Sequence, residues 1–344
     1  MIRYFIHLMF LIIISLSSCN QGNLKVKSTS TIQIYDGKYD SHFPLTPVDS
    51  DIAKIERTVK LITNLTFYQA YDFSFESGIT PENLTDDDLK TKATKSYIVE
   101  QPASGTATLI AQSFNKIALL TCEHVVCASD TLINYFLDQN GQLTSFIQSI
   151  AIKTRESMNI ITLPGLKNIH ILASDKNIDV AIVTATLDPM PIFPIPVFDY
   201  PMGKAEELNW GTFVYVIGFP YGKKLISTAI VSDPRRDKKN GFIIDATMHR
   251  GASGGIIVAL RDGAPNFELV GMASALSAER EYILRPEDEF NVLNIEFGRP
   301  YEGNIIIDKR MKINYGIVYA ISIEAIQDFI KSNKDKIADA GFTL

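Results

Sequence analysis

Apolar residues fall in short runs from Ser96 onward, and Gly, Pro, Asn or Asp separate most of these runs. Residues 105–126 hold two runs joined by the turn 113–116, which predicts a hairpin. Further runs lie at 159–165, 169–175, 179–185, 212–220, 241–248, 254–260 and 267–275. Many short strands at close spacing favour a barrel or a sandwich over alternating βαβ units.

Helical spacing occurs near both ends of this strand-rich region. Residues 50–62 begin with a Ser-Asp cap and predict a short helix, and the aromatic and β-branched stretch 65–75 predicts a strand. Residues 76–94 are rich in charge and turn formers and predict a surface loop. Near the C-terminus, residues 322–340 place four apolar side chains on one helical face, which predicts a helix covering a barrel end: Ile323, Ile326, Phe329 and Ile330.

The first residues have the pattern of a secretory signal, with Arg3 in the head and an apolar stretch from Leu8 to Leu16. This stretch is too short to span a bilayer comfortably. The sequence LSSC that ends at Cys19 resembles the bacterial lipoprotein box, which implies a signal peptide over 1–18 and lipidation of Cys19. An uncleaved anchor, or an ordinary signal cleaved nearby, is the alternative. Residues 19–50 are then a polar tether, and the protein is expected on a membrane of the bacterial cell envelope outside the cytoplasm, periplasmic or surface-exposed.

Composition is that of a globular protein. The 344 residues are 46% hydrophobic and 21% charged, enough for two or three small units or one large all-β core. A net charge of −6 argues against nucleic acid as the main partner. Cys122 and Cys127 are five positions apart, about 7.5 Å along a helical path and close to the upper limit of about 7 Å for a disulfide. An exported compartment permits the bond, but two free, buried cysteines are favoured.

Three glycines surround Ser253 in the segment HRGASGGIIVAL. Backbone order at glycine is costly, so a turn here needs a reason. A tight turn would point the backbone N–H groups of Gly251 and Ser253 into one small space, as donors for an oxyanion. Gly254 and Gly255 would let the next strand pass close behind. A flexible glycine turn is the alternative interpretation.

A nucleophilic serine needs a base, and the chain has five histidines. His7 lies in the signal and His42 in the tether. His170 sits within a predicted strand, and His249 lies four residues before Ser253, presented to solvent or substrate. His124 ends an apolar strand and begins a turn, so its ring can project from a rigid frame. His124 is therefore the candidate base.

The acid that orients this base should be nearly buried, and Asp179 has apolar residues on both sides. Asp175 and Asp188 lie in more polar surroundings and have the character of turn residues. The alternative for Asp179 is a turn cap in a hairpin. The order His124, Asp179, Ser253 is that of the chymotrypsin architecture.

Several motifs now resemble one family. The sequences LLTCEHVV, DVAIV and GASGG resemble the histidine, aspartate and serine motifs of trypsin-like serine proteases. The nearer resemblance is to the HtrA/Deg branch. It is carried by four further segments between about residues 55 and 335, which are 216–222, 245–258, 268–275 and 314–330.

The resemblance implies an all-β fold, with two six-stranded antiparallel β-barrels of the chymotrypsin type and a C-terminal helix. The protease domain would span 51–335, with insertions at about 76–94 and 276–312 and a tail at 336–344. The short stretch after Ile330 leaves no room for the PDZ domain of many relatives.

The same resemblance implies the roles of the site residues. Ser253 would be the nucleophile, His124 the general base and then acid, and Asp179 the group that holds the ring tautomer. The oxyanion hole would be formed by the N–H groups of Gly251 and Ser253, and no metal or organic cofactor would be needed.

Specificity would depend on a pocket with Thr247 at its base, lined by Met272, Ala273 and Ser274. Because Thr247 is not a carboxylate, Arg and Lys are disfavoured and a small or medium apolar side chain is expected. Ala252 replaces the usual polar residue, so activation through an ion pair with a freed N-terminal amine is not expected.

Two functions from different classes follow. The first is an exported, lipid-anchored serine endopeptidase that acts on proteins or peptides. The alternative is a catalytically inactive protease-like lipoprotein that binds peptides or partners. A cysteine enzyme that uses Cys122 or Cys127 with His124 is a weaker third possibility, because sequence neighbours rarely present both side chains to one substrate.

Overall fold

The computed structural model describes residues 35–139, 141–163, 165–190, 192–238, 241–286 and 303–344. The expected signal peptide, Cys19 and the first half of the expected tether, residues 19–34, lie outside the described residues. Residues Tyr35–Leu344 form one compact unit. None of the helices in the described part of the chain has the length and apolar character needed to span a bilayer.

The first half of the compact unit is a seven-stranded antiparallel sheet with the order β4-β5-β1-β2-β3-β7-β6. Its strands are β1 (Val59–Asp72), β2 (Lys95–Ser113), β3 (Lys116–Thr121), β4 (Thr131–Leu137), β5 (Leu143–Ile160), β6 (Leu166–Asp175) and β7 (Val180–Leu187). The predicted hairpin at 105–126 is the pair β2–β3.

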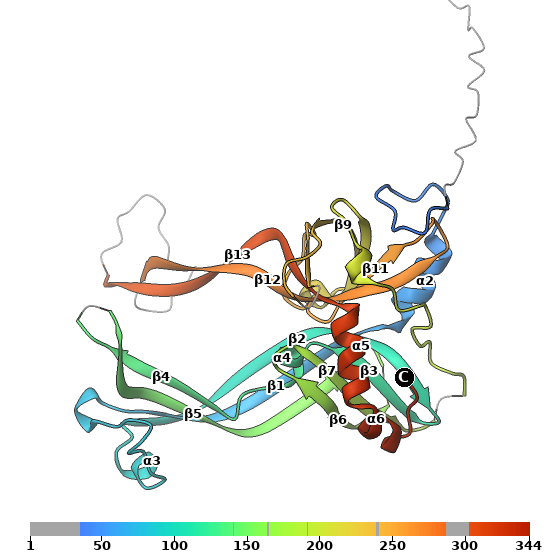
Figure 1. Cartoon of the computed structure of the whole chain (residues 1–344). Helices are drawn as coiled ribbons and strands as arrows, with labels where there is room; N and C mark the ends of the chain where they lie inside the picture. Colours follow the sequence, from blue (N-terminus) through green and yellow to red (C-terminus); the bar gives the residue numbers. More distant parts are fainter. Residues whose placement is uncertain (1–34, 140, 164, 191, 239–240, 287–302) are drawn as a thin grey trace, which may run out of the picture. The chain divides into compact units, whose positions relative to one another are not determined.

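The second half is a closed six-stranded barrel with the order β10-β13-β12-β11-β8-β9 (Figure 1). Its strands are β8 (Phe213–Gly218), β9 (Leu225–Asp233), β10 (Phe242–Ile244), β11 (Ile256–Leu260), β12 (Phe267–Pro286) and β13 (Ile305–Ser322). The short helix η3 (Pro220–Gly222) follows β8 and forms the end of segment 216–222, one of the segments that resemble the HtrA/Deg branch.

The prediction of two six-stranded barrels is therefore confirmed for the second half and wrong for the first. The first half is a strongly curled, open sheet of seven strands. Its end strand β4 pairs with residues 143–152, the first part of β5, and the described strand pairs do not join β4 to β6. The great length of β1, β2 and β5 carries β4 away from the position where it would close a barrel.

Two helical regions cover the strands. The predicted helix at 50–62 is shorter than expected, because α2 (Asp49–Thr58) gives way at Val59 to strand pairing with Thr108. At the C-terminus, α5 (Ile323–Ser332) is capped by the hydroxyl of Ser322, and its four predicted apolar residues are buried. A second short helix, α6 (Lys334–Asp339), follows. The C-terminal helix is thus confirmed, divided in two.

One buried apolar cluster runs through both halves of the unit. It includes Leu119 and Ile182 from the sheet and Ile257, Met272 and Ile321 from the barrel. Burial of this kind is the main favourable term in folding. The shared core fixes the two halves against each other, so side chains at their junction are held in place.

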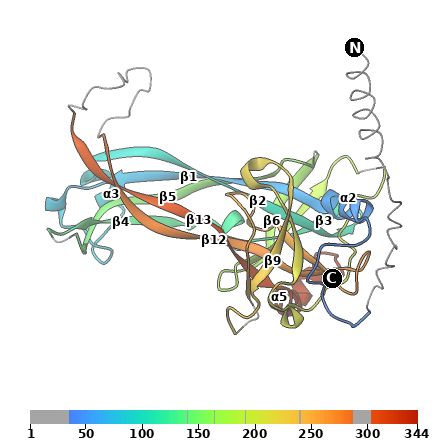
Figure 2. The same cartoon turned by 90° about the horizontal axis from the view of Figure 1, so that it is seen from above.

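Beyond this core, two β-structures extend on the same side of the body in both views (Figure 1, Figure 2). One is the outer part of β1, β2, β4 and β5, which has a small core of its own around Phe73, Ile79, Ile147 and Ile150. Residues 76–94 contain α3 (Asp88–Thr91), and they cover this small core with Ile79, which is 1% exposed. The other extension is the end of the β12–β13 hairpin, formed by the described parts of 276–312.

Candidate active site

His124, Asp179 and Ser253 come from three different segments at the junction of the sheet and the barrel. His124 lies in α4 (Glu123–Val126), a single helical turn that directly follows β3. Asp179 immediately precedes β7, and Ser253 lies in the turn before β11. β3 and β7 are paired, with Thr121 opposite Ala181, so the histidine and the aspartate leave the same edge of the sheet.

The imidazole of His124 contacts the carboxylate of Asp179. Its Nδ1 lies 2.8 Å from Oδ2 and 2.9 Å from Oδ1, and the backbone N–H of His124 donates to Oδ1 at 3.0 Å. Asp179 adopts φ +58°, a conformation that aspartate tolerates better than most residues. This backbone turn lets one carboxylate bind the ring and the backbone of the same histidine.

Ser274 completes the surroundings of this carboxylate by donating its hydroxyl to Oδ2 at 2.5 Å. Burial alone would raise the pKa of Asp179, but the hydrogen bonds from His124 and Ser274 outweigh it and lower the pKa. The carboxylate is therefore ionised at neutral pH and accepts a hydrogen bond from the N–H at Nδ1 of His124. That leaves Nε2 of His124, on a side chain that is 49% exposed, as the ring nitrogen available to accept a proton.

Close contact with neighbouring backbone requires glycine at two positions beside Ser253. Gly251 and Gly254 adopt φ +96° and +88°. A Cβ on Gly251 would lie 2.5 Å from the carbonyl oxygen of Phe219, and a Cβ on Gly254 would lie 1.9 Å from that of Thr106. The turn passes so close to neighbouring backbone that side chains have no room.

Two N–H groups of this turn are free to bind a ligand. In the described part of the chain, the N–H groups of Gly251 and Ser253 donate to no other group. Tyr221 holds the peptide plane before Gly251, because its N–H donates to the carbonyl of Arg250 at 2.8 Å. Unpaired N–H groups held in a fixed turn are what an oxyanion hole requires.

The hydroxyl of Ser253 donates to the carbonyl of Ser274 at 2.8 Å, and within the described residues no hydrogen bond joins it to His124. The structure thus brings histidine and aspartate into direct contact, while the serine hydroxyl is turned toward β12. Rotation about χ1 is the movement by which that hydroxyl would leave Ser274.

Thr106 on β2 fastens the serine turn to the sheet. Its N–H donates to the carbonyl of Ser253 at 2.7 Å, and its hydroxyl donates to the carbonyl of Gly251 at 2.9 Å. The same hydroxyl accepts from the N–H of Phe219 at 2.8 Å. Sequence reasoning did not single out Thr106, and it gave Ser274 a role in the pocket but none beside Asp179. Neither residue carries a local signal, since both act only through partners distant in sequence.

The four residues expected around the specificity pocket do not share one environment. Met272 and Ala273 are buried, at 0% and 2% exposed. Ser274 contacts Asp179 and Ser253, as described above. Thr247 is exposed and lines a hollow together with residues of β9, including Thr228.

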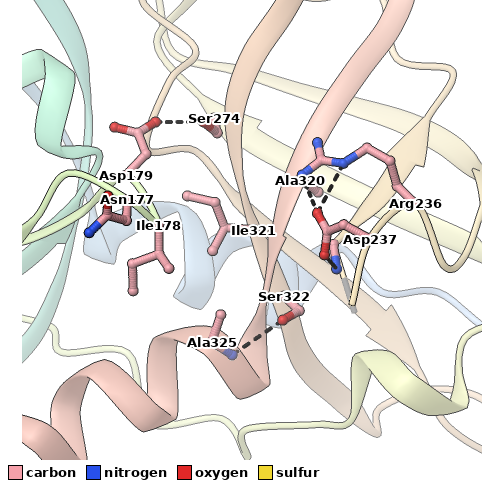
Figure 3. Close-up of a pocket in the computed structure, with 11 residues that line it drawn as sticks. Asn177, Ile178, Asp179, Arg236, Asp237, Ser274, Ala320, Ile321, Ser322 and Ala325 are labelled. Atoms are coloured by element: carbon pink, nitrogen blue, oxygen red, sulfur yellow. Dashed lines mark hydrogen bonds and ion pairs between the residues drawn. The ribbon is translucent and has the colours of Figure 1, made fainter. Parts of the chain in front are cut away.

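A cavity of about 220 Å³ lies beside Asp179 and Ser274 (Figure 3). Ile178, Ile321 and Ala325 give it an apolar wall. On another side stands Arg236, which forms an ion pair with the adjacent Asp237 at 2.6 Å.

The two cysteines of the described region are both free thiols, as the sequence favoured, but the expected burial holds for Cys122 alone, because Cys127 is half-buried. Cys122 is buried, and burial followed by the charge of Asp179 raises the pKa of its thiol. Burial likewise raises the pKa of Cys127 to about 11. Cys122, His124 and Asp179 offer donor atoms within 4.8 Å of one another. A thiol held in its protonated form is poorly suited to act as a nucleophile.

The other described histidines have different surroundings. Nδ1 of His170 lies 2.8 Å from the carbonyl of Asn168, and Nδ1 of His42 lies 2.9 Å from that of Phe43. The ring of His249 stacks against Tyr221 with centroids 4.6 Å apart, so it is less open to solvent than its position before the serine suggested.

Comparison with known proteins finds a family model that matches part of the chain. Residues 105–272, just under half of the chain, match the family model described as a trypsin-like peptidase domain. His124, Asp179 and Ser253 all lie within the matched range. No curated protein matches the chain.

Two similar solved structures are of the HtrA-type protease AlgW with a tripeptide, one of them a variant of that protein. They are 16% and 15% identical to this chain, with TM-scores of 0.41 and 0.42. Each match covers 84% of this chain and 64% of the other, so the chain spans less than two thirds of their length.

Proposed function

We propose that this protein is a serine endopeptidase that hydrolyses peptide bonds in proteins or peptides through Ser253, His124 and Asp179. The observation that carries the proposal is the short contact of Nδ1 of His124 with Asp179, 2.8 Å to Oδ2, beside a serine turn with two free N–H groups. The match of residues 105–272 to the trypsin-like peptidase model supports the same activity.

In the proposed reaction, the hydroxyl of Ser253 turns from Ser274 toward Nε2 of His124 and attacks the carbonyl carbon of the substrate. His124 takes the hydroxyl proton, and Asp179 stabilises the imidazolium. The N–H groups of Gly251 and Ser253 bind the oxyanion of the tetrahedral intermediate. His124 then gives its proton to the leaving amine, which breaks the C–N bond and leaves an acyl-enzyme. Water, deprotonated by His124, attacks this ester, and the proton returns to Ser253 as the acid product leaves.

A fluorophosphonate probe tests this function without knowledge of the substrate. The wild-type protein should be labelled at Ser253, and Ser253→Ala should not be labelled. Labelling absent from both proteins would contradict the proposal.

A second function is favoured by one observation, the hydrogen bond from the Ser253 hydroxyl to Ser274 in place of His124. A protein that keeps this arrangement would bind peptides or partners without cleaving them. Failure of the wild type to react with the probe, together with peptide binding that Ser253→Ala leaves unchanged, would favour this binding module.

The substrate preference we propose is a small or medium apolar side chain before the cleaved bond, because Thr247 places no carboxylate at the expected base of the pocket. A profile of cleaved peptides tests this preference directly. Predominant cleavage after Arg or Lys would contradict it.

Localisation is proposed from the sequence alone, as lipid attachment through Cys19 to a membrane of the bacterial cell envelope, outside the cytoplasm. The substitution Cys19→Ala should move the protein from the membrane fraction to the soluble fraction. Unchanged fractionation would remove Cys19 as the anchor.

A further inference from the structure

The outer part of β2, residues 95–107, forms an edge of the sheet. β2 pairs with β1 continuously, from Thr108 opposite Val59 to Lys95 opposite Asp72, with no shift in register. On its other side, β2 pairs with β3 only from Thr108 onward. Over residues 95–107 that side therefore has no strand partner in the described part of the chain.

The contact with the serine turn shows which backbone groups point to this free side. Thr106 donates its N–H to Ser253, away from β1. Its partner on β1 is Leu61, whose carbonyl accepts from Ile161 on the far side of β1. In an antiparallel ladder the direction alternates from residue to residue. The outward positions beyond Thr106 are thus Ser104, Pro102, Glu100, Ile98 and Ser96.

The stretch is long, regular and open to solvent. Lys95–Ile98 and Glu100–Pro102 are all exposed, and the side chain of Ile98 is 69% exposed. Proteins usually shorten, bend or cover such an edge, because its unpaired groups accept another strand. Pro102 is the one outward position of the five without an N–H, so donors remain on both sides of it.

We infer that this edge, Ser96–Ser104, binds one flank of an extended substrate polypeptide as an added strand. The inference rests on the proposed function for the identity of the bound chain. The inference is based on the position of the edge next to the serine turn. The N–H of Thr106 donates to the carbonyl of Ser253, and Ser104 is the next residue whose backbone groups point away from β1. A polypeptide held at the serine would meet this edge directly, and the nine residues Ser96–Ser104 span about 26 Å.

This arrangement selects a class of substrate. Strand addition uses the backbone of the bound chain, so it is tolerant of sequence, but it requires an extended segment with free N–H groups. Unfolded segments poor in proline fit this requirement, whereas compact folded domains and very short peptides do not.

Two substitutions change the number of outward donors in opposite directions. Glu100→Pro removes one outward N–H without removing a bond to β1, and the matched control Glu100→Ala keeps that N–H. Pro102→Ala adds an outward N–H. Each is combined with Ser253→Ala, and the dissociation constant for fluorescein-labelled, reduced and carboxymethylated lysozyme is measured by anisotropy. Thermal unfolding verifies that each variant is folded.

One hydrogen bond corresponds to about a fivefold change in affinity. We expect Glu100→Pro to weaken binding about fivefold, Glu100→Ala to stay within twofold of the parent, and Pro102→Ala to tighten binding several-fold. With Ser253 present, Glu100→Pro should react with the fluorophosphonate at the parent rate, because that probe does not reach the edge.

Equal binding by Glu100→Pro and Glu100→Ala, or no gain from Pro102→Ala, would overturn the inference. The inference would also be overturned if Pro102→Ala strengthened self-association and the unfolded lysozyme did not compete with it. In that case the edge would bind a second copy of this chain. Absence of fluorophosphonate labelling, with the Glu100→Pro effect on binding intact, would instead refute the hydrolase and leave the edge as a binding surface.

Discussion

Replacing Thr106 with valine would separate the hydrogen bonds of this side chain from its packing. Thr106 is 0% exposed, and its hydroxyl joins the N–H of Phe219 to the carbonyl of Gly251 at 2.8 and 2.9 Å. Valine has nearly the same shape but no hydroxyl. Both backbone groups would then stay buried without this partner.

The size of the effect follows from these two groups. Each buried polar group left unsatisfied costs about 1–3 kcal/mol, and the added methyl offsets part of the loss. We therefore expect Thr106→Val to lower the free energy of unfolding by about 2–5 kcal/mol. Thr106→Ser keeps the hydroxyl and removes one methyl group, which should cost only about 1 kcal/mol.

Urea unfolding measures the stability difference, and the rate of fluorophosphonate labelling measures the effect on the site. Because the Thr106 hydroxyl holds the carbonyl of Gly251, Thr106→Val should label at least about tenfold more slowly, while Thr106→Ser stays within about threefold of wild type. If Thr106→Val were as stable as Thr106→Ser, or reacted at the wild-type rate, the assigned role of the hydroxyl would be wrong.

Four other predictions follow from the structure. Asp179→Asn should lower turnover about 10⁴-fold, as in the Ser-His-Asp template, and a near-normal rate in a peptidase assay would exclude the assigned role. Folding lowers the pKa of Asp179, so its ionised carboxylate stabilises the protein at pH values above the pKa of the unfolded chain, about 3.9. This stability is lost as the pH falls through the pKa of the folded protein. The difference in urea midpoint between wild type and Asp179→Asn should therefore shrink from pH 6 to pH 2.5. Gly254→Ala should abolish folding or labelling because its Cβ meets backbone at 1.9 Å, whereas Gly211→Ala, at φ +81° in open space, should cost only about 1 kcal/mol of strain; equal urea midpoints for the two would contradict the steric argument. At pH 8, Cys127 should react slowly with iodoacetamide and faster toward pH 10, because burial raises its pKa to about 11, and Cys122 should react only on unfolding; rapid native labelling of either would contradict the assigned burial.

Local pattern was enough to predict many individual strands and the C-terminal helix. The apolar runs at 179–185 and 254–260 became β7 and β11, and the apolar face of 322–340 is buried in α5. β4, most of β5 and β9 were not predicted. In residues 143–160, fully buried positions are few, and Ile147 and Ile150 are buried in the small core that the loop 76–94 helps to cover. The hydrophobic pattern of this segment is therefore weak until its partners are known.

The sequence by itself determined which residue types were available for the chemistry, in which order, and where glycine was required. The tertiary structure decided what local pattern cannot carry: an open sheet in place of a first barrel, Ser274 beside Asp179, Thr106 beneath the serine turn, and a serine hydroxyl turned toward Ser274. The physical reason is that propensity and periodicity act over a few residues, whereas the hydrogen bonds that define these features join residues 21, 95 and 145 positions apart. Such contacts exist only once strand pairing and the shared core have fixed both halves of the unit.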